Sequence, residues 1–246
     1  MLFSIITVCY NAREVIEDTI LSVVNQNFDQ IEYIIIDGGS TDGSLEIIRK
    51  YKDKIDIFIS EDDQGIYDAM NKGLRLANGQ FVNFLNAGDS FVSNNILVDI
   101  AYQINKNKVQ IISGDFILVN DFNKKQRIIH TKKITLKNLK KDFYACHQSI
   151  FINKKITQDY DTSYEIKADY KWVISALSNT TENSVYKFNE PIVYYSKEGF
   201  SNHFFLKNLK ELIRLHYEFF GAFQVIKNTH IYIYRFSRSI KDYLKY

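Results

Sequence analysis

The stretch FSIITVCYNAREVIEDTILSVVNQNF, residues 3–28, decides the fold because its hydrophobic period changes along its length. Its first eight residues are a nearly continuous apolar run of strand length. Further on, one helical face collects Val15, Ile16, Thr19, Ile20, Val23 and Val24. Asn11, with Glu14 three residues later, resembles a capping box, so we expect the helix to begin just beyond the strand.

The same alternation continues to residue 86. Further strands are predicted at YIIID (33–37), IDIFIS (55–60) and QFVNFLN (80–86), and further helices at LEIIRKYK (45–52) and GIYDAMNKGLRLA (65–77). The last helix is expected to close at Asn78-Gly79. Strands that alternate with helices predict a mainly parallel α/β sheet covered by helices on both faces.

Composition excludes several classes of protein. With 246 residues and 46% hydrophobic content, the chain is long and apolar enough to fold around a core. The formal charge of +2 gives no reason to expect a nucleic-acid partner. The two cysteines, Cys9 and Cys146, lie far apart in the sequence, which favours a reducing compartment. No apolar run could span a bilayer, so we expect a cytoplasmic protein.

Polar loops follow the predicted strands, where ligands bind in such sheets. They are CYNA (9–12), DGGSTDG (37–43), SEDDQG (60–65) and NAGDS (86–90). Each loop alone is compatible with an ordinary turn, since Asn, Asp, Gly and Ser are common turn formers and Asp42 can cap a helix. Because all four are expected at one edge of the sheet, together they favour a binding site.

Ordered motifs in these segments resemble a known family. SIITVCYNA (4–12), IIIDGGSTDGS (34–44), GIYDAMNKGLRLANGQFVNFLNAGD (65–89) and ADYKW (168–172) are similar to the family 2 inverting glycosyltransferases of the GT-A fold. The resemblance is strongest to bacterial enzymes that build surface polysaccharides such as lipopolysaccharide or capsule. The chain has neither a P-loop nor a G-x-G-x-x-G motif after the first strand, which disfavours NTPases and Rossmann dehydrogenases.

The resemblance implies a Rossmann-like, mixed but mainly parallel sheet flanked by helices. It implies a catalytic domain over 1–203, with a nucleotide-binding half (1–105) and an acceptor half (106–203), followed by a helical tail (204–246). It also implies transfer of a hexose or N-acetylhexosamine from a nucleotide sugar, with UDP favoured, to a glycan or lipid-linked saccharide. We expect a single displacement with one carboxylate as base.

The resemblance also assigns residues to the nucleotide sugar. Asp37 is placed at the uracil or ribose, where it can accept hydrogen bonds, and the ring of Tyr10 can offer an apolar face. Asp68 and Asn71 lie one helical turn apart and so on one face. The alternative for Asp37 is a structural role in its own turn. The expected donor-side residues are Thr7, Cys9, Tyr10, Asn11, Asp37, Asp63, Asp68, Asn71, Asn86 and Ala87.

Family members carry a D-x-D motif after the fourth strand that holds a divalent ion on the diphosphate, and this chain has NAGD there. Asn86 and Gly88 occupy positions where carboxylates could stand, which leaves Asp89 as the expected ligand of Mn²⁺ or Mg²⁺. His203 is a further candidate ligand. The alternative for Asp89 is a turn before a helix over 93–104, although Ser93 or Asn94 can cap that helix.

On the acceptor or diphosphate side, His147 and Gln148 resemble the family's His-Gln pair, and Lys197 and Ser201 lie in a segment similar to its closing loop. Asp169, near the start of a helix that opens at Ala168, corresponds to the catalytic base. A structural histidine and a carboxylate that stabilises a helix dipole remain the alternatives for His147 and Asp169.

The tail over 204–246 differs in composition from the rest. It mixes aromatic residues with eight basic and three acidic residues, a net charge of +5, and Gly221 interrupts its helical pattern. Such a segment suits an anionic membrane surface on the inner face of the cytoplasmic membrane. Packing on the catalytic domain or on a second subunit of a homo-oligomer is the alternative.

Two other functions remain open from the sequence. An inactive homologue that binds a nucleotide sugar or carbohydrate is supported by the missing carboxylates of NAGD. A nucleotidyltransferase would normally show a glycine-rich basic loop near the first strand, and CYNAREV (9–15) has none.

Overall fold

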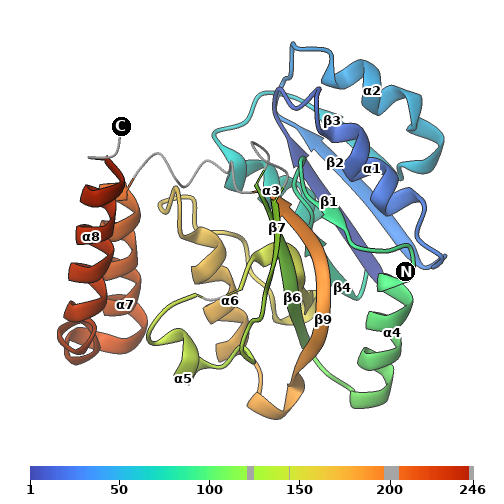
Figure 1. Ribbon diagram of the computed structural model, residues 1–246. Helices are drawn as coiled ribbons and strands as arrows, with labels where there is room; N and C mark the ends of the chain where they lie inside the picture. Colours follow the sequence, from blue (N-terminus) through green and yellow to red (C-terminus); the bar gives the residue numbers. More distant parts are fainter. Residues whose placement is uncertain (121–124, 144, 197–204, 244–246) are drawn as a thin grey trace.

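The computed structural model describes residues 1–120, 125–143, 145–196 and 205–243. Within them, a nine-stranded mixed sheet has the order β3-β2-β1-β4-β8-β6-β9-β5, with β7 paired to β6. Helices flank the sheet, and the chain ends in a helical pair beside it (Figure 1). The strands are β1 (Phe3–Cys9), β2 (Ile31–Asp37), β3 (Ile57–Ser60), β4 (Phe81–Phe84), β5 (Ser90–Phe91), β6 (Ile111–Asn120), β7 (Lys125–Ile129), β8 (Ile150–Asn153) and β9 (Val185–Ser196).

The first four strands form the parallel half that the sequence predicts. In the β1–β2 pair Cys9 lies opposite Asp37, and in the β2–β3 pair Asp37 lies opposite Ser60. Strand β4 pairs with β1 in parallel as well. The loops after these strands therefore gather at one edge, as expected. Beyond β4 the sheet becomes mixed, because β8 runs antiparallel to both β4 and β6.

The side chains of β1 alternate between two cores, one on each face of the sheet. Ile6 and Val8 pack with the helices over 66–76 (α3) and 168–178 (α6), whereas Phe3 and Ile5 pack with those over 16–24 (α1) and 96–107 (α4). Burial on both faces explains the nearly continuous apolar run of β1. The helices are α1 (Ile16–Val24), α2 (Ser44–Lys50), α3 (Ile66–Leu76), α4 (Ile96–Asn107), α5 (Leu136–Leu139), α6 (Ala168–Ser178), α7 (Phe205–Lys227) and α8 (Thr229–Tyr243), and η2 (His147–Ser149) is a short 3-10 helix.

The expected capping of two helices is wrong. Helix α1 begins at Ile16, and no side chain at its N-cap, Val15, forms a capping hydrogen bond. Asn11 instead adopts a left-handed backbone with φ of 47°, and its side-chain oxygen accepts from the Thr41 backbone N–H at 3.0 Å. Its short polar side chain tolerates that conformation, so the loop turns before the helix starts. Helix α4 likewise begins after Asn95, without a side-chain cap from Ser93 or Asn94.

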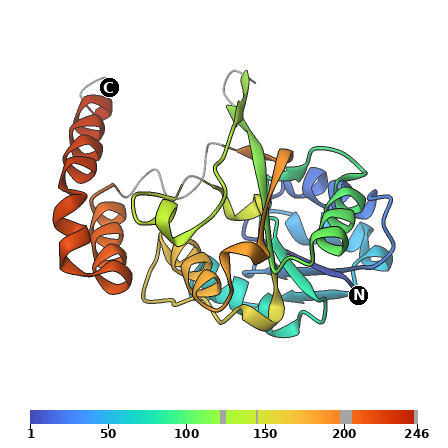
Figure 2. The same cartoon turned by 90° about the horizontal axis from the view of Figure 1, so that it is seen from below.

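Helices α7 and α8 lie side by side at one end of the molecule (Figures 1 and 2). Gly221 interrupts α7 with φ of 75° and ψ of 171°, which confirms the break expected from the sequence. The inner face of α7 buries Leu212 and Leu215 completely within the core that also holds α3 and α6. The tail therefore packs on the rest of the chain along one face.

Candidate active site

The loops after β1, β2 and β3 meet above the edge of the sheet. A methyl group built on Gly38 would lie 2.4 Å from a carboxylate oxygen of Asp63 and 3.4 Å from the ring of Tyr10. Tyr10 is 66% exposed, so most of its side chain remains accessible. A side chain at position 38 would therefore displace the carboxylate of Asp63. An exposed aromatic ring beside a carboxylate provides one apolar and one hydrogen-bonding contact for a ligand such as a nucleoside.

Asp37 is fully buried and organises this edge from below. Its carboxylate accepts from the backbone N–H groups of Gly39 at 3.0 Å and Ser40 at 2.9 Å, and from the hydroxyl of Ser60 at 2.8 Å. Burial alone would raise the pKa of Asp37, but the hydrogen bonds from Ser40 and Ser60 outweigh it and lower the pKa below its usual value. Asp37 therefore holds the loop as an ionised side chain.

Three of the expected donor-side residues point into the protein. Thr7 is fully buried against the Tyr33 hydroxyl at 3.1 Å, and the Cys9 thiol donates to Asp37 at 3.4 Å. Asn71 is buried, and its amide both donates to and accepts from the backbone of Tyr160, at 2.9 and 2.6 Å. These polar groups satisfy buried partners of the fold, and their expected contacts with the donor stay a prediction.

Two further residues expected on the donor side, Asp68 and Ala87, bond to the main chain of neighbouring segments. Asp68 accepts from the backbone N–H of Gln64 at 3.1 Å and lies 3.6 Å from the ammonium of Lys72. Ala87 donates its backbone N–H to Val8 at 3.1 Å, which continues the β1–β4 pairing. Both residues lie at the loop edge, where Asp68 also supports the start of α3.

The geometry of the NAGD turn explains why a second carboxylate is missing. Gly88 has φ of 95°, a region where an aspartate would be strained by about 1 kcal/mol or more. Thr19 of α1 holds the turn, because its hydroxyl donates to the carbonyl of Asp89 at 2.8 Å and accepts from the N–H of Gly88 at 3.0 Å. Thr19 therefore fixes the turn that carries Asp89, and position 88 contributes only its backbone N–H to this contact.

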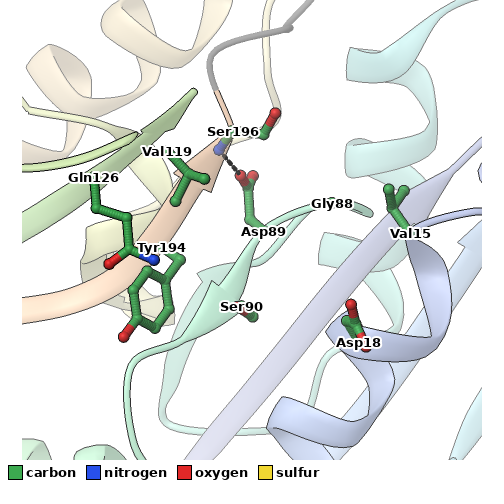
Figure 3. A pocket seen from close by; sticks show the side chains of 9 residues that line it. All are labelled: Val15, Asp18, Gly88, Asp89, Ser90, Val119, Gln126, Tyr194 and Ser196. Atoms are coloured by element: carbon green, nitrogen blue, oxygen red, sulfur yellow. Dashed lines mark hydrogen bonds between the residues drawn. The ribbon is translucent and has the colours of Figure 1, made fainter. Parts of the chain in front are cut away.

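Asp89 is 5% exposed and joins the turn to two other elements. One carboxylate oxygen accepts from the side chain of Gln148 at 2.7 Å, and the other from the backbone N–H of Ser196 at 3.1 Å. Figure 3 shows the carboxylate directed at the end of β9. Gln148 belongs to η2, which precedes β8. The NAGD turn (86–89, below called the acidic turn), η2 and β9 therefore meet at one carboxylate.

A pocket of about 280 Å³ opens beside Asp89. This volume is near the lower limit for a ligand pocket, about 300 Å³. Helix α1, the acidic turn, the β6–β7 hairpin and β9 supply its walls (Figure 3). The lining residues are Val15, Asp18, Gly88, Asp89, Ser90, Val119, Gln126, Tyr194 and Ser196.

His147 connects the acidic turn to the start of α6. One ring nitrogen lies 3.3 Å from the side-chain nitrogen of Asn86, and the other lies 3.4 Å from a carboxylate oxygen of Asp169. The other oxygen of Asp169 accepts from the backbone N–H of Tyr170 at 2.7 Å. Burial would raise the pKa of Asp169, but His147 and the nearby charge of Lys167 lower it overall. Asp169 is therefore an ionised carboxylate, 19% exposed.

Two buried amide oxygens beside these carboxylates have no hydrogen-bond partner among the described residues: those of Asn86 and Gln148. Orphaned buried acceptors call for a missing donor or cation. No three His, Cys, Asp or Glu side chains in the described part of the chain form a group that could hold a metal. The residues thus fit a divalent ion only if a bound ligand supplies part of its coordination sphere. The protein would then contribute Asp89 as the charged ligand and amide oxygens as neutral ones.

The structure brings Asn86, Asp89, His147, Gln148 and Asp169 together, and the roles expected for them stay predictions. The predictions for Lys197, Ser201 and His203 lie outside the described residues.

Sequence reasoning missed residues that support this cluster from behind. Besides Thr19, fully buried Asn83 donates its amide to the carbonyls of Gln148 at 2.8 Å and Ile150 at 2.9 Å, and so anchors η2. Asn83 lies in the middle of β4, where a polar side chain in an apolar run was the available signal. A buried amide in a strand requires partners, and here its N–H₂ group finds them in the backbone of Gln148 and Ile150.

Comparison with known proteins shows that the sequence is similar to glycosyltransferases. The family described as Glycosyl transferase family 2 matches residues 4–170. A PGL/p-HBAD biosynthesis glycosyltransferase of Mycobacterium tuberculosis is 29% identical over 225 residues, covering 87% of this chain and 86% of that protein. The UDP-Glc:alpha-D-GlcNAc-diphosphoundecaprenol beta-1,3-glucosyltransferase WfgD of Escherichia coli is 24% identical over 185 residues, covering 75% of this chain and 73% of that protein.

Solved structures share the fold. Staphylococcus aureus TarS 1-349 in complex with UDP superposes with a TM-score of 0.69 at 22% identity, over 88% of this chain and 64% of that chain. The mannosyltransferase PcManGT of Pyrobaculum calidifontis, in complex with GDP-Man and Mn²⁺, gives a TM-score of 0.60 at 17% identity, over 88% of this chain and 63% of that chain. The chain thus spans less than two thirds of these two structures. The expected GT-A architecture is confirmed.

Proposed function

The chain belongs to glycosyl transferase family 2, and from this premise we propose that it transfers a hexose or N-acetylhexosamine from a UDP-sugar to a glycan or lipid-linked saccharide. We place the reaction in the assembly of a bacterial surface glycan. The observation that carries the proposal is the convergence of Asp89 and Asp169 on the adjacent residues Gln148 and His147. One carboxylate is suited to the diphosphate side and the other to the acceptor.

In the proposed reaction Asp169 acts as the general base of an inverting single displacement. Its oxygen takes the proton of the acceptor hydroxyl while that hydroxyl oxygen attacks the anomeric carbon, and the nucleoside diphosphate leaves from the opposite face. His147 orients the carboxylate and lowers its pKa, so the base is ionised before the acceptor arrives. Asp89, with the amide oxygens of Asn86 and Gln148, would hold Mn²⁺ or Mg²⁺, which when bound neutralises charge on the leaving diphosphate.

Residues of the site and the names of related proteins both support a UDP-sugar as the donor. Tyr10 and Asp63 form an exposed edge suited to a base and ribose. TarS structures contain UDP and UDP-GlcNAc, and the name of the E. coli relative specifies UDP-Glc. GDP-Man is the donor in the more distant PcManGT structure. UDP is therefore the first nucleotide to test.

The function is tested by transfer assays with a panel of UDP- and GDP-sugars, with and without Mn²⁺, using a diphosphate-lipid-linked saccharide as acceptor. We expect release of UDP coupled to growth of the acceptor by one sugar. An inactive binding homologue is the second candidate, because NAGD carries one carboxylate. Nucleotide-dependent thermal stabilisation without release of UDP or transfer to any acceptor would favour that candidate.

The composite ion site leads to a prediction for metal binding. We expect Mn²⁺ to bind at least about tenfold more tightly in the presence of UDP, which corresponds to about 1.4 kcal/mol. Phosphate oxygens then supply the negative ligands that the protein lacks. Asp89→Ala should erase this difference, and Asn86→Ala should only reduce it, as measured by titration calorimetry.

Asp18→Ala is the matched control for this titration, because Asp18 lines the same pocket without the contact to Gln148. It should leave the enhancement by UDP unchanged. Equal enhancement in the wild type and in Asp89→Ala would contradict the assignment of Asp89.

We extend the proposal to the surface of the C-terminal helices. None of the helices in the described ranges is long and apolar enough to cross a bilayer. The outer face of α7 and α8 nevertheless exposes Phe223 at 78%, Ile226 at 71% and Ile233 at 62%. The side chain of Arg235 is turned to Asp142 of the catalytic part, away from this apolar surface. This surface suits the interface of a membrane that carries a lipid-linked acceptor.

A double substitution, Phe223→Asp with Ile226→Asp, tests this surface without uncovering the core. We expect it to weaken binding to vesicles of anionic phospholipid by roughly tenfold or more, since burial of one such side chain contributes about 1.5–3 kcal/mol. Sedimentation with vesicles measures the effect. Tyr102→Asp on α4 is the control, since Tyr102 is 59% exposed on a helix at the other end of the molecule (Figure 1). Unchanged sedimentation of the double variant would leave a second subunit as the partner.

A further inference from the structure

Helix α7 reaches back to the loop that precedes Asp169. Glu211 is buried, at 7% exposure, although it is a carboxylate in a helix with an exposed opposite face. One of its oxygens accepts from the backbone N–H of Glu165 at 2.9 Å, and the other accepts from those of Ile166 and Lys167, both at 2.9 Å. A buried carboxylate that receives three consecutive main-chain donors fixes the path of that segment.

The start of α6 needs such an acceptor from outside. The N-cap position is Lys167, whose side chain carries only donors and cannot cap the helix. The N–H groups at the beginning of a helix have no acceptor within the helix, and negative charge is favourable there. Glu211, from a distant part of the chain, accepts from the N–H of Lys167, which is one of these groups, and brings negative charge to the start of the helix.

The same loop is held from its other side by α3. The hydroxyl of Tyr67 donates to the carbonyl of Ile166 at 2.9 Å, so the peptide units on either side of Ile166 are fixed by α7 and α3. Asp169 follows Lys167 by two residues and is the second residue of α6. Its contact with His147, at 3.4 Å, therefore depends on where this loop places the first turn of the helix.

We propose that Glu211 is a positioning residue for the catalytic base, so that α7 completes the active site. This role rests on the proposed function, in which Asp169 accepts the acceptor proton. Glu211 touches no reacting atom. It acts by holding the backbone over 165–167, and thereby keeps Asp169 at its place beside His147.

The experiment compares Glu211→Gln with Glu218→Gln in the full chain. Gln keeps the shape of Glu211 but presents an amide N–H₂ group where an acceptor is needed. Glu218 lies two turns further along α7 and binds the Tyr164 hydroxyl at 2.7 Å and the Lys171 ammonium at 2.5 Å, so its substitution also removes contacts between α7 and the catalytic part. It is a matched control, because it leaves the amides of 165–167 bonded.

We expect Glu211→Gln to lower kcat for sugar transfer roughly ten- to a hundredfold, since a displacement of about 1 Å can cost a hundredfold. KM for the UDP-sugar should change less than about twofold, because the donor edge is untouched. Hydrogen exchange at the amides of 165–167 should accelerate, while that of β1 stays unchanged. Glu218→Gln should leave kcat and these amides near the wild type.

A wild-type kcat in Glu211→Gln with accelerated exchange at 165–167 would overturn the positioning role. Equal losses of kcat in both variants would also overturn it, because they would reflect general loosening of α7. Should Glu211→Gln fold poorly, Tyr67→Phe releases the same loop from α3 and should lower kcat with unchanged donor KM, and an unchanged kcat there would count against the role. Absence of transfer by the wild type would refute the proposed function itself.

Discussion

Asp169→Asn is expected to lower kcat for sugar transfer by a factor of about 10² to 10⁴, the range that a general base contributes. The substitution keeps the size of the side chain and removes its ability to take a proton. Donor binding should survive, because Tyr10 and Asp63 lie on the other loops of the site. The expected result is a large loss in kcat with a nearly unchanged dissociation constant for UDP, measured by steady-state kinetics and calorimetry.

The pH dependence of the wild type follows from the same carboxylate. Burial would raise the pKa of Asp169, but His147 and Lys167 lower it below the usual value of an aspartate. The active form is the deprotonated one, so its contribution is complete at neutral pH and is lost only as the pH falls through the lowered pKa. We therefore expect the acidic limb that belongs to Asp169 to lie below the ordinary range of a carboxyl group.

Asp161→Asn is the matched control, since it is the same chemical change at a carboxylate that binds the Lys171 ammonium at 2.8 Å. The Lys171 contact helps to hold the pKa of Asp161 at about 2 against the effect of burial, so this residue is also ionised. We expect its substitution to affect stability more than kcat. Turnover by Asp169→Asn close to the wild-type rate would refute the assignment of the base.

The sequence predicted the strands and helices well wherever the local hydrophobic pattern and the sheet topology agree. The apolar period of 3–28 and the repeated strand and helix segments are set by burial on two faces of the sheet, so the parallel half of the fold followed from them. The resemblance named the residues that the structure brings together around Asp89 and Asp169, and their roles stay predictions. The missing carboxylate at position 88 has a local cause, the left-handed backbone of Gly88, which sequence patterns alone do not reveal.

The sequence predicted poorly where a polar side chain serves a partner that is distant along the chain. Asn71 appears on the same helical face as Asp68, yet its amide binds the backbone of Tyr160, 89 residues further on. Glu211 belongs to a segment whose composition indicated a separate tail, yet it binds the loop before Asp169. Helical periodicity reports which face is buried, whereas the identity of a buried polar partner depends on the tertiary fold.

Trp172→Ala should produce the largest loss of stability among the substitutions considered. The indole is 2% exposed, stacks on the ring of Tyr160 at 5.0 Å, meets the edge of Phe84 at 5.6 Å and donates to the carbonyl of Gln158 at 2.8 Å. Removal leaves a cavity and an unpaired carbonyl, at a cost of about 3–5 kcal/mol. For a chain of this size that corresponds to a fall in Tm of roughly 6–20 °C, measured by calorimetry.

This substitution also tests whether the packing that stabilises α6 is needed to position Asp169 for catalysis. Trp172 lies one turn after Asp169, so loss of its packing should release the helix start that Asp169 needs, and kcat should fall even at temperatures where the variant is folded. Tyr102→Ala, at a residue 59% exposed on α4, should change Tm by only about 2 °C or less. A folded Trp172→Ala variant with full kcat would show that the loop held by Glu211 and Tyr67 positions Asp169 without help from the aromatic core.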